Sequence, residues 1–345
     1  MEQYSGEIQK NQKGRLNKVE GMTFSRIIGT GSYFPEKILT NNDLEKMVDT
    51  SDEWITSRTG IKERRIAEKE TTSEMGYYAS LEAMKSANID KSDIDGIIFA
   101  TCTPDCLVPS AACFLGGKLG VKSPFSFDIN AACSGFIYAI ALADSLIKNN
   151  LAENLLVVGS EKLSSILNWK DRNTCILLGD AAGAAVVSKS NEPGIRSVCL
   201  KADGEYTELL ICRAGGSEAL AHRESFNIEE NLFFMKGNEV FKVAVRSMSD
   251  VAVEAVEKSD LRLDEIDFFI PHQANLRIID AAAKRLKLDS EKVIVTLDKF
   301  GNTSAASIPT ALDISVKSNK IKKGDNIVSA AFGGGLTWAS MVFTL

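Results

Sequence analysis

Histidine is scarce in this chain: only His222 and His272 occur among 345 residues. A histidine that handles protons in a catalytic site must therefore be one of these two. His222 lies in the polar, irregular segment GSEALAHRESFNIEEN, which predicts a solvated loop residue. His272 follows the apolar run FFIP and precedes a helical pattern, so it stands at the end of a predicted strand.

Long apolar runs are also lacking. No stretch reaches the roughly 18 apolar residues that a membrane-spanning helix requires, and the longest candidate, 136–147, is interrupted by Asp144. Residues 1–21 are polar, without the apolar stretch of a secretory signal, and we expect a disordered extension there. The expected location is the cytoplasm, away from any membrane.

The cysteines and the charge exclude further classes. Seven cysteines, an odd number in a chain of this length, predict free thiols in a reducing compartment. Cys102, Cys106 and Cys113 match no common zinc spacing, so no metal is expected there. A net charge of -6 argues against a nucleic-acid-binding protein. The triple glycine of FGGGLTW is followed by neither Lys-Ser nor Lys-Thr, and GTGSYF lacks the third glycine of a dinucleotide fingerprint.

Short apolar runs alternate with helical patterns, which indicates an α/β fold. Strands are predicted at 96–101, 125–129, 154–160, 183–188, 268–270, 292–297, 326–332 and 339–345. Helices are predicted at 73–87, 134–148, 237–258, 274–287 and 304–318. The order of these elements occurs twice, which predicts two duplicated halves that face each other, at residues 22–195 and 196–345.

Three strand-to-helix turns carry the candidate chemistry. They hold Cys133, His272 and Asn302, and since such turns lie at the carboxyl ends of strands, facing halves would bring them into one pocket. Cys133 stands at a predicted helix N-terminus, which favours a thiolate, among small neighbours that leave room for a ligand. Each residue also has a structural interpretation: a buried apolar thiol, a core histidine, or an asparagine that caps a turn.

Four motifs in this order carry a resemblance to a known family: AACSGF (131–136), PHQAN (271–275), GNTSAAS (301–307) and FGGGLTW (332–338). With them the chain from about Met22 to Leu345 resembles the β-ketoacyl-[acyl-carrier-protein] synthase III family, which initiates type II fatty acid synthesis. The resemblance implies a thiolase fold with five αβαβα layers, a homodimer and no cofactor. It implies condensation of an acyl-CoA, typically acetyl-CoA, with malonyl-[acyl-carrier protein].

The same resemblance assigns roles. Cys133 is the implied nucleophile, its N–H and that of Gly334 form the implied oxyanion hole, and His272 and Asn302 are the implied donors to the malonyl-derived enolate. Related elongating synthases use Cys-His-His, which a chain with only one further histidine does not offer.

Three further groups of residues follow from the resemblance. The implied CoA-binding residues are Thr50, Trp54, Arg58 and Arg172. The implied acyl-pocket residues are Val108, which reaches into the partner subunit, and Leu178; bulkier side chains are common in relatives at both places, which leaves the preferred acyl group open. The implied docking residues for an acidic carrier protein are Lys242, Arg246, Arg277, Lys284 and Arg285.

Other readings stay open at this point. One is a condensing enzyme of secondary metabolism on the same fold, which takes a longer or branched acyl-CoA. A non-enzymatic protein that keeps the fold and an unrelated cysteine hydrolase are the weaker alternatives.

Overall fold

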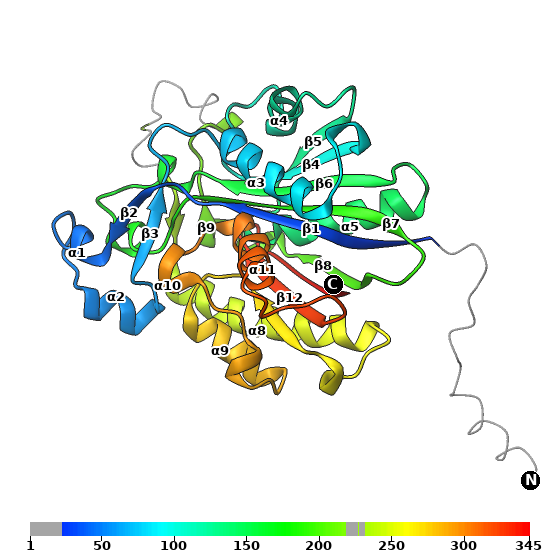
Figure 1. Ribbon diagram of the computed structural model, residues 1–345. Coiled ribbons are helices and arrows are strands. Elements are labelled where there is room, and N and C mark those ends of the chain that lie inside the picture. The colour runs from blue at the N-terminus through cyan, green and yellow to red at the C-terminus, as the bar shows by residue number, and fades with distance from the viewer. Residues whose placement is uncertain (1–22, 219–226, 228–231) are drawn as a thin grey trace, which may run out of the picture.

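Two large β-sheets, of five and four strands, alternate with layers of helices through the molecule (Figure 1), and two further sheets have two strands each. The computed structural model describes residues 23–218, 227 and 232–345. The expected extension at residues 1–21 and the predicted loop residue His222 lie outside the described residues.

The first sheet has five strands and one fully buried central strand. Its order is β1 (Phe24–Tyr33), β7 (Ala181–Ser190), β6 (Asn154–Glu161), β4 (Gly96–Ala100) and β5 (Phe125–Ile129). β4 runs parallel to both β5 and β6, whereas β7 runs antiparallel to β6 and β1. Every residue of β4 is buried, as expected for a parallel strand covered by helices on both faces.

The second sheet repeats the order and directions of the first. It contains β11 (Phe268–Pro271), β12 (Asn326–Gly333), β13 (Thr337–Thr344) and β8 (Ile195–Ala202). β11 is parallel to β12, and β13 is antiparallel to β12 and β8. This correspondence agrees with a duplication, while the division of the chain at residue 195 stays a prediction.

The predicted strand 292–297 is wrong. In the place equivalent to β5, only Val293 bridges to Phe269 of β11. The side chain of Gln273 binds the backbone groups that a neighbouring strand would bind: its Nε2 donates to the carbonyl of Ile294, and its Oε1 accepts from the amide of Thr296. The chain then enters a short helix instead of extending the sheet.

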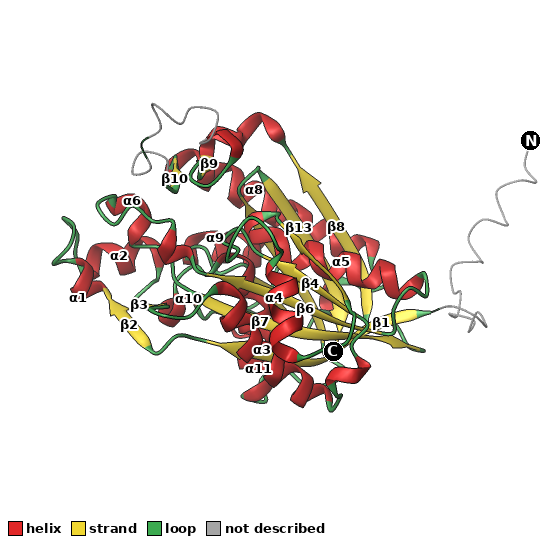
Figure 2. Cartoon of the chain, turned by 90° about the horizontal axis from the view of Figure 1, so that it is seen from above, coloured by secondary structure: helices red, strands yellow, loops and turns green. Residues whose placement is uncertain are grey.

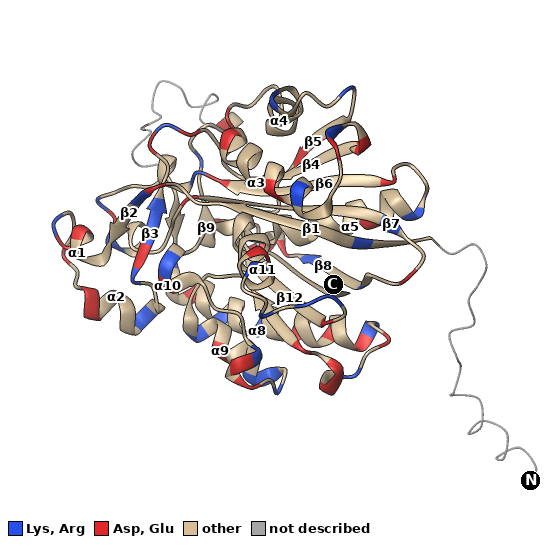
Figure 3. Ribbon diagram, viewed as in Figure 1, with Lys and Arg blue, Asp and Glu red and all other residues tan. Residues whose placement is uncertain are grey.

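Helices fill the space between the sheets and cover both outer faces. The middle layer contains α5 (Gly135–Lys148) and α11 (Ser307–Lys317), and the outer helices are α3 (Thr72–Ala87), α4 (Ala111–Leu119), α8 (Gly237–Lys258) and α9 (Leu276–Arg285). Viewed from above, the helices flank the strands on either side (Figure 2). Charged side chains concentrate on the outer helices and loops (Figure 3), and the three largest apolar clusters lie between successive layers.

The predicted helices agree closely with these bounds, with one correction. The helix predicted at 304–318 begins as a 3₁₀ turn, η8 (Ser304–Ala306), before α11. The equivalent turn before α5 is η2 (Ala132–Ser134).

Short elements complete the described chain. They are β2 (Lys37–Thr40), β3 (Glu63–Ile66), β9 (Leu210–Ile211), β10 (Phe234–Met235), α1 (Asn41–Leu44), α2 (Asp52–Thr59), α6 (Arg172–Cys175) and α10 (Leu297–Phe300), with 3₁₀ turns η1 (Lys91–Asp93), η3 (Leu163–Ser165), η4 (Gly204–Leu209), η6 (Leu263–Glu265) and η7 (Ser290–Lys292). Among the helices that the structure describes, none combines the length and the apolar character needed to cross a membrane.

Candidate active site

Two matching turns, one from each half, meet at the centre of the molecule. In the first, the side-chain oxygen of Asn130 accepts the N–H of Ala132 at 3.1 Å; in the second, Asn302 accepts the N–H of Ser304 at 2.9 Å. Ala132 and Ser304 both adopt left-handed backbone conformations, with φ of 46° and 48°. η2 and η8 contact each other, so the helices α5 and α11 begin side by side.

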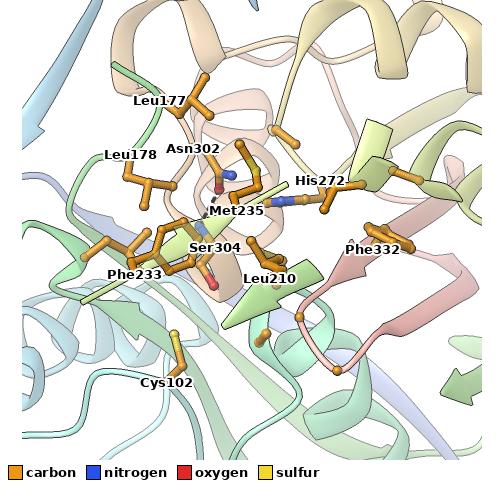
Figure 4. Close-up of a pocket in the computed structure, with 18 of the residues that line it drawn as sticks. Cys102, Leu177, Leu178, Leu210, Phe233, Met235, His272, Asn302, Ser304 and Phe332 are labelled. Atoms are coloured by element: carbon orange, nitrogen blue, oxygen red, sulfur yellow. Dashed lines mark hydrogen bonds between the residues drawn. The ribbon is translucent and has the colours of Figure 1, made fainter. Parts of the chain in front are cut away.

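A pocket of about 440 Å³ opens between these turns. Its lining includes Cys133, His272, Asn302, Gly334 and Leu178, so the structure brings together five of the residues that the sequence assigns to the reaction. Figure 4 shows His272 and Asn302 beside each other, above Ser304. Most of the remaining wall is apolar, as a site for a small acyl chain requires.

Cys133 is a poorly ionised thiol. It lies in η2, directly before α5, as the sequence predicts, but burial raises its pKa to about 12. The neighbouring Ser304 acts in the opposite direction, and the charge of Glu161 raises the pKa further. The expectation that the helix N-terminus favours the thiolate therefore needs correction, because desolvation outweighs it.

His272 is a neutral hydrogen-bond donor. It directly follows β11, it is 2% exposed, and burial lowers its pKa to about 3. Its Nδ1 lies 2.7 Å from the hydroxyl of Ser307. Among the described residues this hydroxyl has no other acceptor, so the O–H donates to Nδ1 and the ring proton is on Nε2. The Nε2–H has no partner in the described part of the chain and is available to a ligand.

Asn302 is a second free donor. Because its Oδ1 accepts from Ser304, its Nδ2 faces the pocket, and no described residue accepts a hydrogen bond from it. Its backbone is fixed on both sides: its N–H donates to the carbonyl of Leu177 at 2.8 Å, and its carbonyl accepts from Gly179 at 3.0 Å. The amide is thus held in place before any substrate arrives.

The glycine loop at the end of β12 lies directly against the nucleophile. A Cβ added at Gly333 would lie 2.6 Å from the backbone nitrogen of Cys133, so only glycine permits this approach. The amide of Gly334, the next residue, has no partner among the described residues and lines the pocket beside Cys133. The arrangement suits an oxyanion hole made of two backbone N–H groups.

Two of the four predicted CoA-binding residues, Trp54 and Arg58, line a groove next to the pocket, and Arg172 contacts Trp54. The guanidinium groups of Arg58 and Arg172 each lie 4.9 Å from the ring of Trp54. Arg172 also donates to the carbonyl of Asp49, the residue before Thr50, at 2.8 Å. Trp54 and Arg58 line the groove, which shares wall residues with the active-site pocket.

The two predicted acyl-pocket residues lie in different places. Leu178 is buried in the pocket wall and bridges to Asn302. Val108 is 84% exposed and lines no described pocket of its own chain. Its predicted role in a partner subunit stays a prediction.

The five basic residues predicted for carrier-protein binding are exposed on α8 and α9, which pack against each other (Figure 3). Lys242 and Arg277 line the same groove as Trp54, and Arg277 lies over the ring of Phe241. Arg246 and Arg285 both lie 3.8 Å from Asp250, so one carboxylate partly offsets two cations.

Sequence reasoning missed the residues that support this site. Ser307 fixes the ring of His272, Ser304 contacts Cys133, and the buried carboxylate of Glu161 lies behind both turns. The available signal was a glutamate at the end of the apolar run NLLVVGSE, where a charged residue is unexpected unless it is bonded inside the protein.

Comparison with known proteins agrees with this geometry. Residues 127–204 match the family described as 3-oxoacyl-[acyl-carrier-protein (ACP)] synthase III, and residues 256–345 match its C-terminal part. A β-ketoacyl-[acyl-carrier-protein] synthase III from Caldanaerobacter subterraneus subsp. tengcongensis is 54% identical over 320 residues, which cover 92% of this chain and 96% of the relative.

Solved structures show the same fold. The crystal structure of 3-oxoacyl-[acyl-carrier-protein] synthase III from Aquifex aeolicus VF5 is 49% identical, with a TM-score of 0.87, and the match covers 93% of this chain and 100% of that one. The priming β-ketosynthase from the R1128 polyketide biosynthetic pathway is 35% identical, with a TM-score of 0.89 and coverage of 94% and 97%. These neighbours confirm the predicted thiolase fold.

Proposed function

The chain belongs to the 3-oxoacyl-[acyl-carrier-protein] synthase III family, and we propose that it condenses an acyl-CoA with malonyl-[acyl-carrier protein] to initiate fatty acid synthesis. The products are 3-oxoacyl-[acyl-carrier protein], CO₂ and CoA. The observation that carries the proposal is a partly buried thiol that shares one pocket with two free N–H donors, His272 Nε2 and Asn302 Nδ2.

In the first half-reaction Cys133 attacks the thioester carbonyl of the acyl-CoA. The oxygen then carries negative charge in the tetrahedral intermediate, and the N–H groups of Cys133 and Gly334 bind it. CoA leaves and the acyl group stays on the sulfur. The approach of the Gly333 backbone to the Cys133 nitrogen supports this assignment.

In the second half-reaction malonyl-[acyl-carrier protein] loses CO₂ and forms an enolate. His272 Nε2–H and Asn302 Nδ2–H donate to the enolate oxygen, and its carbon attacks the acyl-cysteine. A neutral histidine suits this role because it keeps its proton over the whole physiological pH range. The protein's N–H donors stabilise both anions, so we infer that neither step needs a metal or a redox cofactor.

The groove at the pocket entrance supports the two proposed partners. Trp54, with Arg172 and Arg58 on its ring, offers a stacking surface for adenine and cations for phosphate groups. The exposed Lys242 and Arg277 on the same groove favour an acidic carrier protein whose prosthetic arm enters the pocket. All seven cysteines are free, which supports the proposed cytoplasmic location.

We also propose a homodimer through the edge of the first sheet. β5 pairs only with β4 in the described chain, which leaves its other edge free. Leu107 and Val108 are 75% and 84% exposed. They precede α4, the helix beside this strand, by a few residues in the sequence. An open strand edge beside exposed apolar side chains is a common protein–protein surface, and sedimentation analysis of the purified protein tests it.

Intact-protein mass spectrometry with a panel of acyl-CoAs tests the proposed function. Wild type should gain the mass of one acyl group and Cys133→Ala should gain none. Loading by acetyl-CoA in preference to longer chains supports initiation of fatty acid synthesis. Preference for a longer or branched acyl-CoA favours a role in secondary metabolism, to which the likeness with the R1128 priming enzyme points. No loading by any CoA ester refutes the proposal.

A further inference from the structure

A fully buried carboxylate lies at the back of the active site, and the reaction described above does not use it. Glu161 ends β6 in the first half, has 0% exposure, and reaches the turn of the second half. Its side-chain oxygens have five donors: the hydroxyls of Thr101, Thr103 and Ser304, and the N–H and thiol of Cys102.

These contacts define the protonation state of Glu161. The Thr101 hydroxyl accepts the N–H of Thr103 at 3.0 Å, and the Thr103 hydroxyl accepts the N–H of Lys162 at 2.9 Å, so both hydroxyl hydrogens point to Glu161. The N–H of Cys102 is a donor by nature. Five donors directed at its oxygens favour the charged form, so Glu161 is an ionised carboxylate, although burial raises its pKa.

Ser304 connects this carboxylate to the nucleophile. Its hydroxyl lies 3.0 Å from Glu161 Oε1, its turn η8 packs against the turn η2 that holds Cys133, and its presence lowers the pKa of the Cys133 thiol. Ser304 also lines the pocket, between the two turns (Figure 4). Ser304 is thus the hydroxyl that borders both the pocket of Cys133 and the carboxylate of Glu161.

The nucleophile needs a base, and His272 is not available as one. Its Nδ1 accepts from Ser307 and its Nε2 carries the ring proton, so it has no free lone pair for the thiol. We propose that Ser304 and Glu161 form a proton relay that deprotonates Cys133 for acyl transfer. The inference goes beyond the proposed function and rests on it for the identity of the nucleophile.

The step balances as follows. Cys133 gives its S–H proton to Ser304 Oγ while Ser304 gives its O–H proton to Glu161, and the sulfur forms a bond to the thioester carbonyl carbon. The bond from that carbon to the CoA sulfur breaks, and the CoA thiolate takes a proton from water. When condensation later releases the Cys133 sulfur, the proton returns from Glu161 by the same path.

Few other titratable groups face this path in the described structure. Cys102 is the nearest, and its own pKa is raised by burial and by Glu161, so it stays a thiol. Lys162 follows Glu161 in sequence, but its Nζ donates to the carbonyl of Glu70. The relay therefore carries one ionised group, Glu161.

Two variants interrupt the relay at different atoms, and a third is their control. Glu161→Gln removes the proton acceptor. Ser304→Ala removes the connecting hydroxyl, and alanine fits the left-handed backbone because Ala132 adopts it in the equivalent turn. Thr101→Val removes one hydrogen bond to Glu161 and leaves the path from Cys133 intact.

Two rates are measured between pH 6 and 9.5: acyl transfer from acyl-CoA by quenched intact mass spectrometry, and alkylation of Cys133 by iodoacetamide. We expect Glu161→Gln and Ser304→Ala to slow acyl transfer by about 10²- to 10⁴-fold at pH 7, the usual contribution of a general base. The deficit should shrink as pH rises, because hydroxide then generates the thiolate. Thr101→Val should slow acyl transfer far less than the two relay variants, because the proton path remains.

The outcomes separate the relay from the proposed function and from a structural role. If folded Glu161→Gln and Ser304→Ala keep the wild-type alkylation profile, or lose rate by the same factor at every pH, the relay is overturned. If Glu161→Gln does not fold, Ser304→Ala decides alone. If wild type accepts no acyl-CoA, the proposed function fails, while the alkylation profiles still test the relay.

Discussion

Removal of the Asn302 amide should separate the two half-reactions. In Asn302→Ala the enolate loses one of its two donors, whereas the acyl-transfer step keeps Cys133 and its oxyanion hole. One donor to a developing oxyanion contributes about 2.7–4 kcal/mol, so we expect malonyl decarboxylation to fall by about 10²- to 10³-fold. Acyl loading should fall much less.

The structure also sets the side effects of this change. Asn302→Ala removes the acceptor for the Ser304 N–H, which costs stability of about 1 kcal/mol. The backbone stays in place because Leu177 and Gly179 hold it. Asn302→Asp keeps the acceptor and lacks the N–H donor, so its decarboxylation should be as impaired as that of Asn302→Ala.

The assay follows release of labelled CO₂ from malonyl-[acyl-carrier protein] by enzyme that has been loaded with an acyl group, and loading itself by mass spectrometry. Thermal unfolding of each variant measures the structural cost. Equal loss of loading and decarboxylation in Asn302→Ala, or wild-type decarboxylation in Asn302→Asp, refutes the division of roles.

Four further predictions follow from the same geometry. Gly333→Ala places a Cβ 2.6 Å from the Cys133 nitrogen, so acyl loading should fall while circular dichroism still shows the folded chain; normal loading contradicts the close approach. The pKa of His272 is about 3 in the folded protein and about 6.5 when unfolded. The rate of condensation by acyl-loaded enzyme should therefore show no change from histidine titration between pH 5 and 8. The free energy of unfolding present above pH 6.5 should decrease by up to about 1.4 kcal/mol per pH unit as the pH falls toward 3. Leu178→Phe should shift the loading panel toward shorter acyl groups, since the side chain lies in the pocket wall; an unchanged panel places the acyl chain elsewhere. Trp54→Ala should raise the KM for acyl-CoA and leave condensation by loaded enzyme unchanged, and a fall in the latter argues against a CoA-specific role.

The sequence predicts elements well where one local pattern decides them. The helix α8 begins and ends at the predicted residues because its apolar residues keep a helical period over its whole length. β1 was missed because Gly29 and Gly31 weaken the strand pattern; the structure shows that they are needed, since a Cβ at either would lie within 2.5 Å of the backbone of α3. The prediction of a strand at 292–297 was wrong because the side chain of Gln273, distant in sequence, binds the backbone of this segment.

The residues of the site also differ in whether the sequence alone reveals them. Cys133 and His272 could be found because each stands at a strand-to-helix turn. Asn302 follows the short helix α10 instead, and it was found because the repeated order of elements matches its turn to that of Cys133. Glu161 and Ser304 could not, because their importance depends on a contact between halves that no local pattern records. The prediction for Val108 stays a prediction for a different reason, since its role concerns a second subunit.

The ends of β6 and β12 explain how two similar halves came to do different work. Asn130 corresponds to Asn302, and the same offset in sequence relates Glu161 on β6 to Gly333 on β12. Each strand end packs against the turn of the opposite half. Gly333 has no side chain, so the backbone reaches the Cys133 nitrogen and places N–H groups where an oxyanion forms. Glu161 instead fills the equivalent place with a carboxylate that accepts from Ser304. One end of the pocket therefore stabilises negative charge on substrate oxygen, while the other accepts a proton, and an acyl transfer to a thiol of raised pKa needs both.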